Sequence, residues 1–339
     1  MHADFPLKFQ ISVKIMSLII NNLFKRHGEN WVIKDVSLQV EKGEILGIFG
    51  VIGVGKSTLI RAIAGEIQHN GGTVFFDADD VSGLNCTERR FHFPKLSNES
   101  FWKTMFKAEV PSELSDGIGQ VLALENALHT AEGVLLLDNQ FCFMDRETRE
   151  ENCKKLRQKV KEKNLAVIFA TNDFNEIFLI CDRVAVLHDG EIKQTGTPRE
   201  IYENPNSVIV ARITGRNNLI EARRLTSGKT DTPEFQTAEG EHQIFTDRID
   251  KSALGAINQN VTLAIRPEHI SISFGASFPE DNLLKAKISG VKYLGATTLI
   301  ELDADGLTLN ALVLRLVGLN IGDECMVGLP PDRIQVLKD

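Results

Sequence analysis

The sequence is poor in the residues that mark several common classes of protein. Its 339 residues include two tryptophans, two tyrosines and five cysteines. The cysteines are scattered and form no C-x-x-C pair, which argues against a disulfide framework or a zinc site and indicates reduced thiols of a cytosol. No apolar run approaches the ~18 residues that are needed to span a bilayer.

Neither a leader sequence nor an excess of positive charge is visible. Residues 1–15 have no sustained apolar stretch, so they do not read as a signal peptide. We expect them to be a disordered or mis-started extension, because a regular pattern begins at Met16. The formal net charge of −8 advertises no basic surface, and we predict no nucleic-acid partner. The length suits about two domains.

A complete glycine-loop motif stands out against this background. The segment GVIGVGKST matches the pattern G-x-x-x-x-G-K-[ST], follows the apolar run Ile45–Phe49 and opens the helix-like segment LIRAIAG. In such a loop the backbone N–H groups turn toward a phosphate, and the following helix adds its positive N-terminal end. We expect Lys56 to reach the β- and γ-phosphates and Ser57 to place its hydroxyl on Mg²⁺. The expected nucleotide-binding residues are Gly50, Val51, Ile52, Gly53, Val54, Gly55, Lys56, Ser57 and Thr58.

The apolar pattern around this motif predicts an α/β domain. Residues 17–49 are expected to form β-strands, and the buried runs 134–137, 165–171 and 184–187 predict further strands. The charged segment 146–163 predicts a helix, and residues 114–128 predict a loop that enters a helix. Residues 80–113 show no clear pattern. Strands that alternate with helices predict a parallel sheet with helices on both faces, as in a P-loop NTPase.

The composition changes after about Gly215. From residue 263 onward, short apolar segments are separated by turns, and Asp305-Gly306 is a hairpin signal. This pattern predicts a small all-β domain of the barrel or sandwich type, and the polar segment 226–244 is expected to be an exposed loop. We therefore divide the chain into an extension (1–15), a nucleotide-binding domain (16–215) and a β-rich domain (216–339).

Three further motifs follow the glycine loop in a characteristic order. They are Leu-Ser-Asp-Gly at 114–117, the strand VLLLD that ends in Asp138, and Thr-Asn-Asp at 171–173. Together with CDRVAVLHDGEIKQTGTPREIYENP and LAIRPEHI, this order resembles the ATP-binding subunits of ABC importers with a C-terminal TOBE-type domain. The resemblance covers roughly residues 17–339 and points to the branch that imports sulfate, polyamines, iron(III) or sugars.

The resemblance implies roles for single residues. Asp138 would hold Mg²⁺ through water, and His27 occupies the position that stacks on adenine. Ser115 and Gly117 match the signature loop, which contacts the γ-phosphate of the opposite subunit, so that ATP would lie between two chains arranged head to tail. Asp145 matches the acid that bridges the two subunits.

Two positions that act on the terminal phosphate depart from the family pattern. Asn139 stands where the resemblance implies a glutamate that orients and deprotonates the attacking water, and Asn172 stands where it implies a switch histidine. An amide holds a water but does not accept its proton at neutral pH, and general acid–base catalysis contributes about 10²–10⁴ in rate. We therefore treat Asn139 and Asn172 as degenerate catalytic positions and expect hydrolysis to be impaired.

The signature loop and the segment before it depart as well. Asp116 replaces a glycine, and its carboxylate would repel the partner's γ-phosphate or simply cap the following helix. The interval from Lys56 to Ser115 is shorter than in the family. The segment RFHFP at 90–94 lacks the glutamine of the loop that reaches the membrane subunit. We expect a reduced helical subdomain.

Two functions fit these observations. The first is an importer subunit that binds MgATP, dimerises and energises solute uptake through an integral membrane permease, with a solute-binding protein as an indirect partner. The second is a non-hydrolytic nucleotide-binding subunit that regulates a transporter or pairs with another ABC ATPase. Both imply ATP and Mg²⁺ as cofactors, a homodimer or a mixed ATPase pair, and a cytoplasmic position on the inner face of the cell membrane. A P-loop kinase or GTPase would leave the β-rich tail unexplained.

Overall fold

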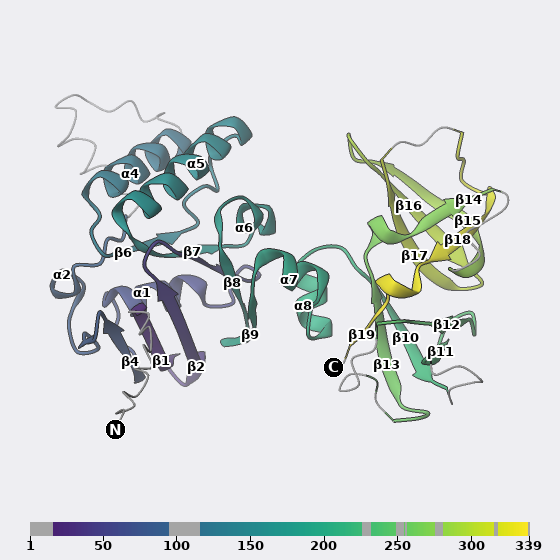
Figure 1. The fold of residues 1–339 in the computed structure, drawn as a ribbon, viewed down its shortest axis with the longest axis horizontal. Helices are drawn as coiled ribbons and strands as arrows, with labels where there is room; N and C mark the ends of the chain where they lie inside the picture. Colours follow the sequence, from purple (N-terminus) through teal and green to yellow (C-terminus); the bar gives the residue numbers. More distant parts are fainter. Residues whose placement is uncertain are drawn as a thin grey trace, which may run out of the picture. The chain divides into compact units, whose positions relative to one another are not determined.

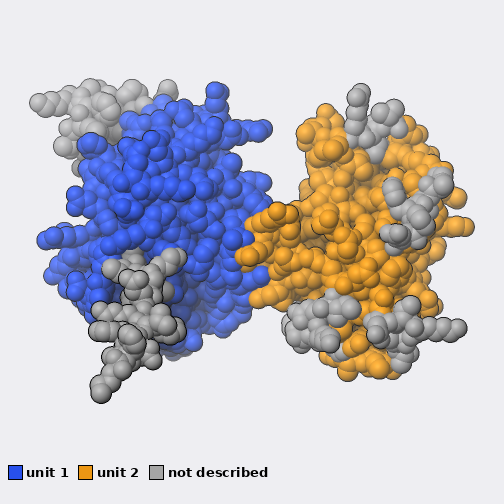
Figure 2. Space-filling model, in the orientation of Figure 1, with its two compact units in different colours: residues 1–198 blue, residues 199–339 orange. Residues whose placement is uncertain are grey.

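A computed structural model describes residues 16–94, 116–225, 232–248, 254, 256–274, 281–314 and 318–337. The chain forms two compact units, residues 1–198 and 199–339 (Figure 2). The extension expected at 1–15 lies outside the described residues. Among the described residues, no helix is both long enough and apolar enough to cross a bilayer.

A mostly parallel sheet forms the centre of the first unit (Figure 1). Its strand order is β6-β7-β3-β8-β9, and only β9 runs antiparallel to its neighbour. Phe49 pairs with Thr171, and Asp138 pairs with Ala170, so the carboxyl ends of three strands meet at one edge. The strands are β3 (Ile45–Phe49), β6 (Val134–Asp138), β7 (Ala166–Thr171), β8 (Arg183–His188) and β9 (Glu191–Gly196).

A second, antiparallel sheet and helix α1 (Lys56–Ala64) share one hydrophobic core with alternate residues of the parallel sheet. The second sheet has the order β2-β1-β4-β5. Its strands are β1 (Met16–His27), β2 (Asn30–Glu41), β4 (Gly71–Phe76) and β5 (Asp79–Asp80). The strands predicted for residues 17–49 are therefore confirmed.

The remaining helices of the first unit begin and end at local capping residues. Helix α5 (Arg146–Lys163) has the predicted bounds, because Asp145 caps its start and Asn164 adopts the left-handed conformation at its end. Helix α4 (Asp116–Thr130) and helix α6 (Phe174–Ile180) precede and follow it. In the segment without a clear pattern, α2 (Cys86–Arg89) begins with a capping box formed by Asn85 and Glu88.

The described residues of the second unit form two short α-helices, two 3-10 turns and two five-stranded antiparallel sheets. The sheets pack apolar residues against each other in one core, which confirms the predicted all-β domain. Asp305 and Gly306 both have positive φ and join β16 to β17, as the hairpin signal predicts. The helices are α7 (Pro198–Glu203) and α8 (Val208–Ile213). The first sheet contains β10 (Asn218–Arg224), β11 (Glu234–Thr237), β12 (Gln243–Phe245), β13 (Asn260–Ile265) and β19 (Gln335–Leu337). The second contains β14 (Ser271–Ser273), β15 (Asn282–Tyr293), β16 (Thr298–Ala304), β17 (Leu307–Val313) and β18 (Glu324–Leu329).

The prediction of an exposed loop over residues 226–244 is partly wrong. Residues 226–231 lie outside the described residues, but β11 occupies 234–237 and β12 begins at 243. Phe235 is fully buried in the core of the second unit, and Thr237 is nearly so. A short strand with only two buried side chains is masked by its polar neighbours in the sequence, so the composition of this segment was misleading.

Candidate functional site

The glycine motif forms a tight loop between β3 and α1, in the middle of the parallel sheet. A Cβ atom at Gly50 would lie 2.5 Å from the carbonyl oxygen of Leu187, so no larger residue fits there without a shift. Gly53 and Gly55 have φ values of +83° and +106°, which L side chains rarely adopt. The loop therefore needs its glycines for backbone shape, as the phosphate-loop reading requires.

Lys56 lies folded into this loop. Its Nζ donates hydrogen bonds to the carbonyl oxygens of Gly50 and Val51 at 2.7 and 3.0 Å, and the residue is only 6% exposed. Burial lowers the pKa of the Lys56 ammonium, while the charge of Asp138 opposes that shift. Ser57 and Thr58 are half-buried in the first turn of α1, and Ile52 at the tip of the loop is 84% exposed.

Asp138 and Asn139 occupy the carboxyl end of β6. The Nδ2 of Asn139 donates to Oδ1 of Asp138 at 3.2 Å, and the backbone of Asn139 is left-handed with φ of 49°. The Oδ1 of Asn139 is buried and has no hydrogen-bond partner. Because buried polar atoms are normally hydrogen-bonded, this oxygen is suited to accept a bond from a water or other donor in the site.

The groups that converge here fit a magnesium nucleotide. The Lys56 ammonium and the N-terminal end of α1 attract phosphate oxygens, and the Ser57 hydroxyl and Asp138 carboxylate are oxygen ligands of the kind that Mg²⁺ prefers. In the described part of the chain, no group of three or more His, Cys, Asp or Glu side chains is placed so that it could hold a metal ion. Ser57 and Asp138 alone would hold a metal ion only together with substrate phosphates and waters, as Mg²⁺ is usually bound.

Asn172 lies on the surface directly after β7, on a turn that is held by hydrogen bonds and ion pairs of the neighbouring residues. The Thr171 hydroxyl donates to Glu176 Oε2 at 2.5 Å and accepts from the backbone N–H of Asp173. Arg149 contacts both acids, with N–O distances of 3.4 Å to Asp173 and 3.7 Å to Glu176. The same guanidinium donates to the carbonyl of Met144, so the turn of Asn172 is tied to the loop that follows Asn139.

Gly117 lies at the start of α4, against the loop after Asp138. A Cβ atom there would be 2.6 Å from the carbonyl oxygen of Phe143. Ser115 lies outside the described residues, so its expected contact with a partner's phosphate stays a prediction. Asp145 caps α5, with its carboxylate accepting from the backbone N–H and the hydroxyl of Thr148.

His27 lies on the exposed end of the β1–β2 hairpin, paired with Asn30. The same hairpin reaches the glycine loop, since a Cβ at Gly55 would lie 3.1 Å from the carbonyl oxygen of Val32. The adjacent Trp31 is 47% exposed, so it is a surface strand residue. The stacking of His27 on an adenine stays a prediction.

Two buried glutamines were missed by the sequence analysis. Gln120 and Gln140 are 0% and 2% exposed, and they join α4 to the loop after Asp138. A sequence signal was present, because Gln120 is the one long polar side chain in the run Ile118–Leu124. Its spacing from Gly117 did not indicate which segment it would contact.

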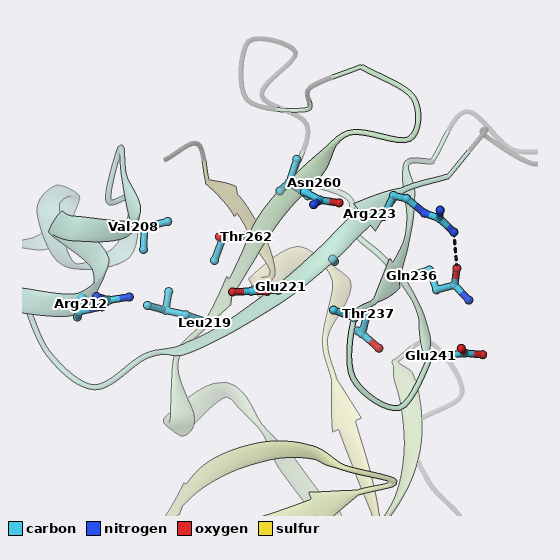
Figure 3. A pocket seen from close by; sticks show the side chains of 13 residues that line it. Val208, Arg212, Leu219, Glu221, Arg223, Gln236, Thr237, Glu241, Asn260 and Thr262 are labelled. Carbon is cyan, nitrogen blue, oxygen red and sulfur yellow. Dashed lines mark hydrogen bonds between the residues drawn. The ribbon is translucent and has the colours of Figure 1, made fainter.

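A groove of about 590 Å³ lies in the second unit, on the β10–β11–β13 face beside α8 (Figure 3). Its lining mixes cations and carboxylates, including Arg212, Glu221 and Glu241. The guanidinium of Arg223 is bonded to Gln236 at 3.1 Å, as the dashed line in Figure 3 shows. The lining of the groove therefore carries charges of both signs, and it lacks the glycine backbone of the phosphate site.

Comparisons with known proteins agree with this architecture. The ABC transporter family model matches residues 33–105, and the TOBE domain model matches residues 263–337. The sulfate/thiosulfate import ATP-binding protein CysA of Bacillus cereus is 28% identical over 329 residues, covering 86% of this chain and 88% of the relative. The spermidine/putrescine import ATP-binding protein PotA of Haemophilus ducreyi is 29% identical over 333 residues, covering 87% of each chain.

A solved structure shows the same fold. A nucleotide-free ATP-binding cassette from an ABC transporter superposes with a TM-score of 0.52 at 18% identity, covering 59% of this chain and 99% of that chain. This likeness confirms the fold class expected for the nucleotide-binding domain.

Proposed function

Because the chain joins an ABC transporter domain to a C-terminal TOBE domain, as importer ATP-binding subunits do, we propose that it binds MgATP and serves such a transporter. MgATP would bind where the glycine loop, Lys56, Ser57 and Asp138 converge, at an interface with a second ATPase chain. Binding would energise solute uptake through a membrane permease.

One observation carries this proposal. The Lys56 ammonium is buried against a loop whose backbone is shaped by its glycines. The charge of Asp138 favours the protonated form of Lys56. A buried cation held by two carbonyl oxygens has no full counter-charge in this loop. A polyphosphate supplies that charge, and Mg²⁺ on Ser57 and Asp138 balances the excess.

We propose in addition that hydrolysis is impaired. The site presents amides at both positions where a proton acceptor or relay would stand, Asn139 and Asn172. The Asn139 amide can hold a water through its unpaired Oδ1, but an amide takes no proton at neutral pH. The chain would then bind and release MgATP more readily than it splits it.

The second candidate is a non-hydrolytic regulatory or paired subunit, and the two amides favour it. In that case the partner would be another ABC ATPase chain with intact catalytic residues, and the two chains would complete each other's sites. In the first candidate the partner is a second copy. For both we propose a position on the cytoplasmic face of the membrane beside a permease, with a solute-binding protein as an indirect partner.

Calorimetry and a turnover assay test the proposal. Titration of the full chain with MgATP should show tight binding, and Lys56→Ala should weaken it by about tenfold or more, because a charge-assisted contact is lost. Lys154→Ala, which removes an exposed lysine of α5, is the matched control and should bind normally.

The turnover assay separates binding from hydrolysis. We expect the wild-type chain alone to turn over ATP no faster than Lys56→Ala does. Turnover well above that control would refute impaired hydrolysis. No MgATP binding by the wild-type chain would refute the proposed function as a whole.

A further inference from the structure

Helix α4 is joined to the loop after Asp138, residues 139–145, by one buried side chain. The Nε2 of Gln120 donates to the carbonyl oxygen of Asn139 at 3.2 Å and lies 3.1 Å from the Cys142 sulfur. The Oε1 of the same side chain accepts from the backbone N–H of Phe143 at 3.0 Å. Gln120 therefore contacts three residues of this loop and is 0% exposed.

Two further contacts hold the same surfaces together. The buried Gln140 donates from Nε2 to the carbonyl oxygen of Gln120 at 2.8 Å. Gly117 in the first turn of α4 leaves no room for a Cβ beside the Phe143 carbonyl. The first turns of the helix and the loop thus pack backbone to backbone, with both amides enclosed between them.

The first residue of this loop, Asn139, lies beside Asp138, the residue proposed to hold Mg²⁺. Asn139 donates from its backbone to Ala170 and from its side chain to Asp138, and its own Oδ1 is the buried oxygen without a partner. A group that binds Asp138 competes with Asn139 Nδ2 for the Asp138 carboxylate, so a change in the position of Asn139 is the expected response. Because enclosed polar groups are costly to leave unpaired, the change has to be followed by Gln120 or has to break its bonds.

We propose that Gln120 is a positioning residue that transmits MgATP binding at Asp138 to the first turns of α4. The inference rests on the proposed function, in which the start of α4 faces the nucleotide of a second chain. MgATP bound at the glycine loop of one chain would then make the start of its α4 more ordered. In the proposed dimer, that part of α4 contacts the nucleotide bound by the second chain. The coupling runs through contacts that the structure contains: Asp138 to Asn139, Asn139 to Gln120, and Gln120 to α4.

Hydrogen–deuterium exchange of the full chain, with and without MgATP, tests the proposal. One peptide should cover the glycine loop (residues 50–60) and one the first turns of α4 (residues 116–124). The protein is used at concentrations where light scattering gives the mass of a single chain, so that a second copy does not touch α4. In the wild-type chain we expect exchange to slow in both peptides with the same MgATP midpoint. The slowing at α4 should be about fivefold or more, the lower end of ordinary coupling between sites.

The test variant is Gln120→Met, which keeps the length of the side chain and removes its hydrogen bonds. We expect the glycine-loop response to remain and the α4 response to disappear. Gln158→Met is the matched control, because Gln158 is an exposed residue of α5 that bonds only within its own helix, to Glu162. The control should respond as the wild-type chain does.

The outcomes are distinguishable. An α4 response that survives in Gln120→Met, or a wild-type chain whose glycine loop responds while α4 does not, overturns the inference and leaves the proposed function standing. A wild-type chain with no response in the glycine loop overturns the proposed function and the inference with it. If circular dichroism shows that Gln120→Met does not fold, Gln140→Met takes its place. In Gln140→Met the α4 response must then weaken, and an unchanged response overturns the inference.

Discussion

The hydroxyl of Thr171 donates a hydrogen bond of 2.5 Å to the carboxylate of Glu176, which is only 3% exposed. The bond links the end of β7 to the first turn of α6 and lies next to Asn172. Burial raises the pKa of the Glu176 carboxyl, and the Thr171 hydroxyl and Arg149 oppose that rise. The turn that carries Asn172 is thus bonded to a carboxyl group that holds its proton more tightly than an exposed glutamate does.

This pair gives a prediction about pH. A raised pKa means that the folded chain holds the Glu176 proton more tightly than the unfolded chain does. Protonated Glu176 therefore contributes its full stabilisation of the folded chain below the ordinary pKa of 4.5. This contribution is lost as the pH rises through the raised pKa of the folded chain. Glu176→Gln has no proton to lose at this position. We expect the stability of the wild-type chain relative to Glu176→Gln to fall from about pH 4 to pH 7. Calorimetric unfolding of both proteins measures this. A wild-type stability that rises with pH relative to that of Glu176→Gln would contradict the prediction.

The two amides of the site predict the result of restoring a base. Asn139→Glu alone should leave ATP turnover incomplete, because Asn172 is still neutral. In addition, φ of 49° suits asparagine better than glutamate. The double variant Asn139→Glu/Asn172→His should exceed the single variant by about tenfold or more, since a proton relay is restored. Steady-state turnover measures both, with Lys56→Ala as the blank. Full recovery from Asn139→Glu would show that one lesion was the whole defect.

The packing of β3 against α6 predicts a cost for a single methyl group. A Cβ at Gly47 would lie 2.5 Å from Ile177 Cδ1 and 2.8 Å from the Cys181 sulfur. Gly47→Ala should lower the free energy of unfolding of this unit by about 1–3 kcal/mol through overpacking. Gly83→Ala meets nothing within 4 Å and is the matched control, expected within about 1 kcal/mol of the wild type. Urea unfolding of the two variants decides, and equal midpoints would show that the core adapts to the methyl group.

In the second unit, a buried arginine predicts a large effect from a conservative change. Arg266 is 4% exposed, stacks 3.9 Å from the Tyr202 ring centroid, and donates to Tyr202, Thr214 and Arg216. Arg266→Lys loses the planar stack and part of the fork of donors. We expect a loss of about 2–3 kcal/mol in the unfolding of this unit.

Arg212→Lys is the control for that change, because Arg212 is an exposed arginine of α8 in the same unit. It should stay within about 0.5 kcal/mol of the wild type. Thermal unfolding followed by circular dichroism compares the two variants. An Arg266→Lys protein as stable as the control would mean that a single ammonium can replace the guanidinium.

The parts of the site that depend on local pattern were predictable from the sequence. The glycine loop, Lys56 and Asp138 follow from a motif and a buried strand, and the ends of α5 follow from its capping residues Asp145 and Asn164. Each of these features is decided by residues within a few positions of one another. Local chemistry is enough to specify them.

The remaining features depend on contacts between distant segments. Gln120 meets residues about twenty positions away, and Arg149 meets Glu176 across two helices, so neither partner is visible in the pattern around the residue. The short strand β11 was missed for a related reason, since its pairing with β10 and β12 and the burial of Phe235 distinguish it from a polar loop. Tertiary pairing decided these features, and periodicity in one segment does not reveal it.

Because Lys56 is bonded to two carbonyls of its own loop, nucleotide binding in the proposed function would be an exchange of hydrogen-bond partners. An incoming anion would compete for the Lys56 ammonium with the carbonyl oxygens of Gly50 and Val51, which belong to the same loop. A single phosphate offers the ammonium little more than the two carbonyls already do, whereas a chain of phosphates also engages the loop amides and the helix end. In the proposed site, Lys56 would therefore favour a polyphosphate over a single phosphate.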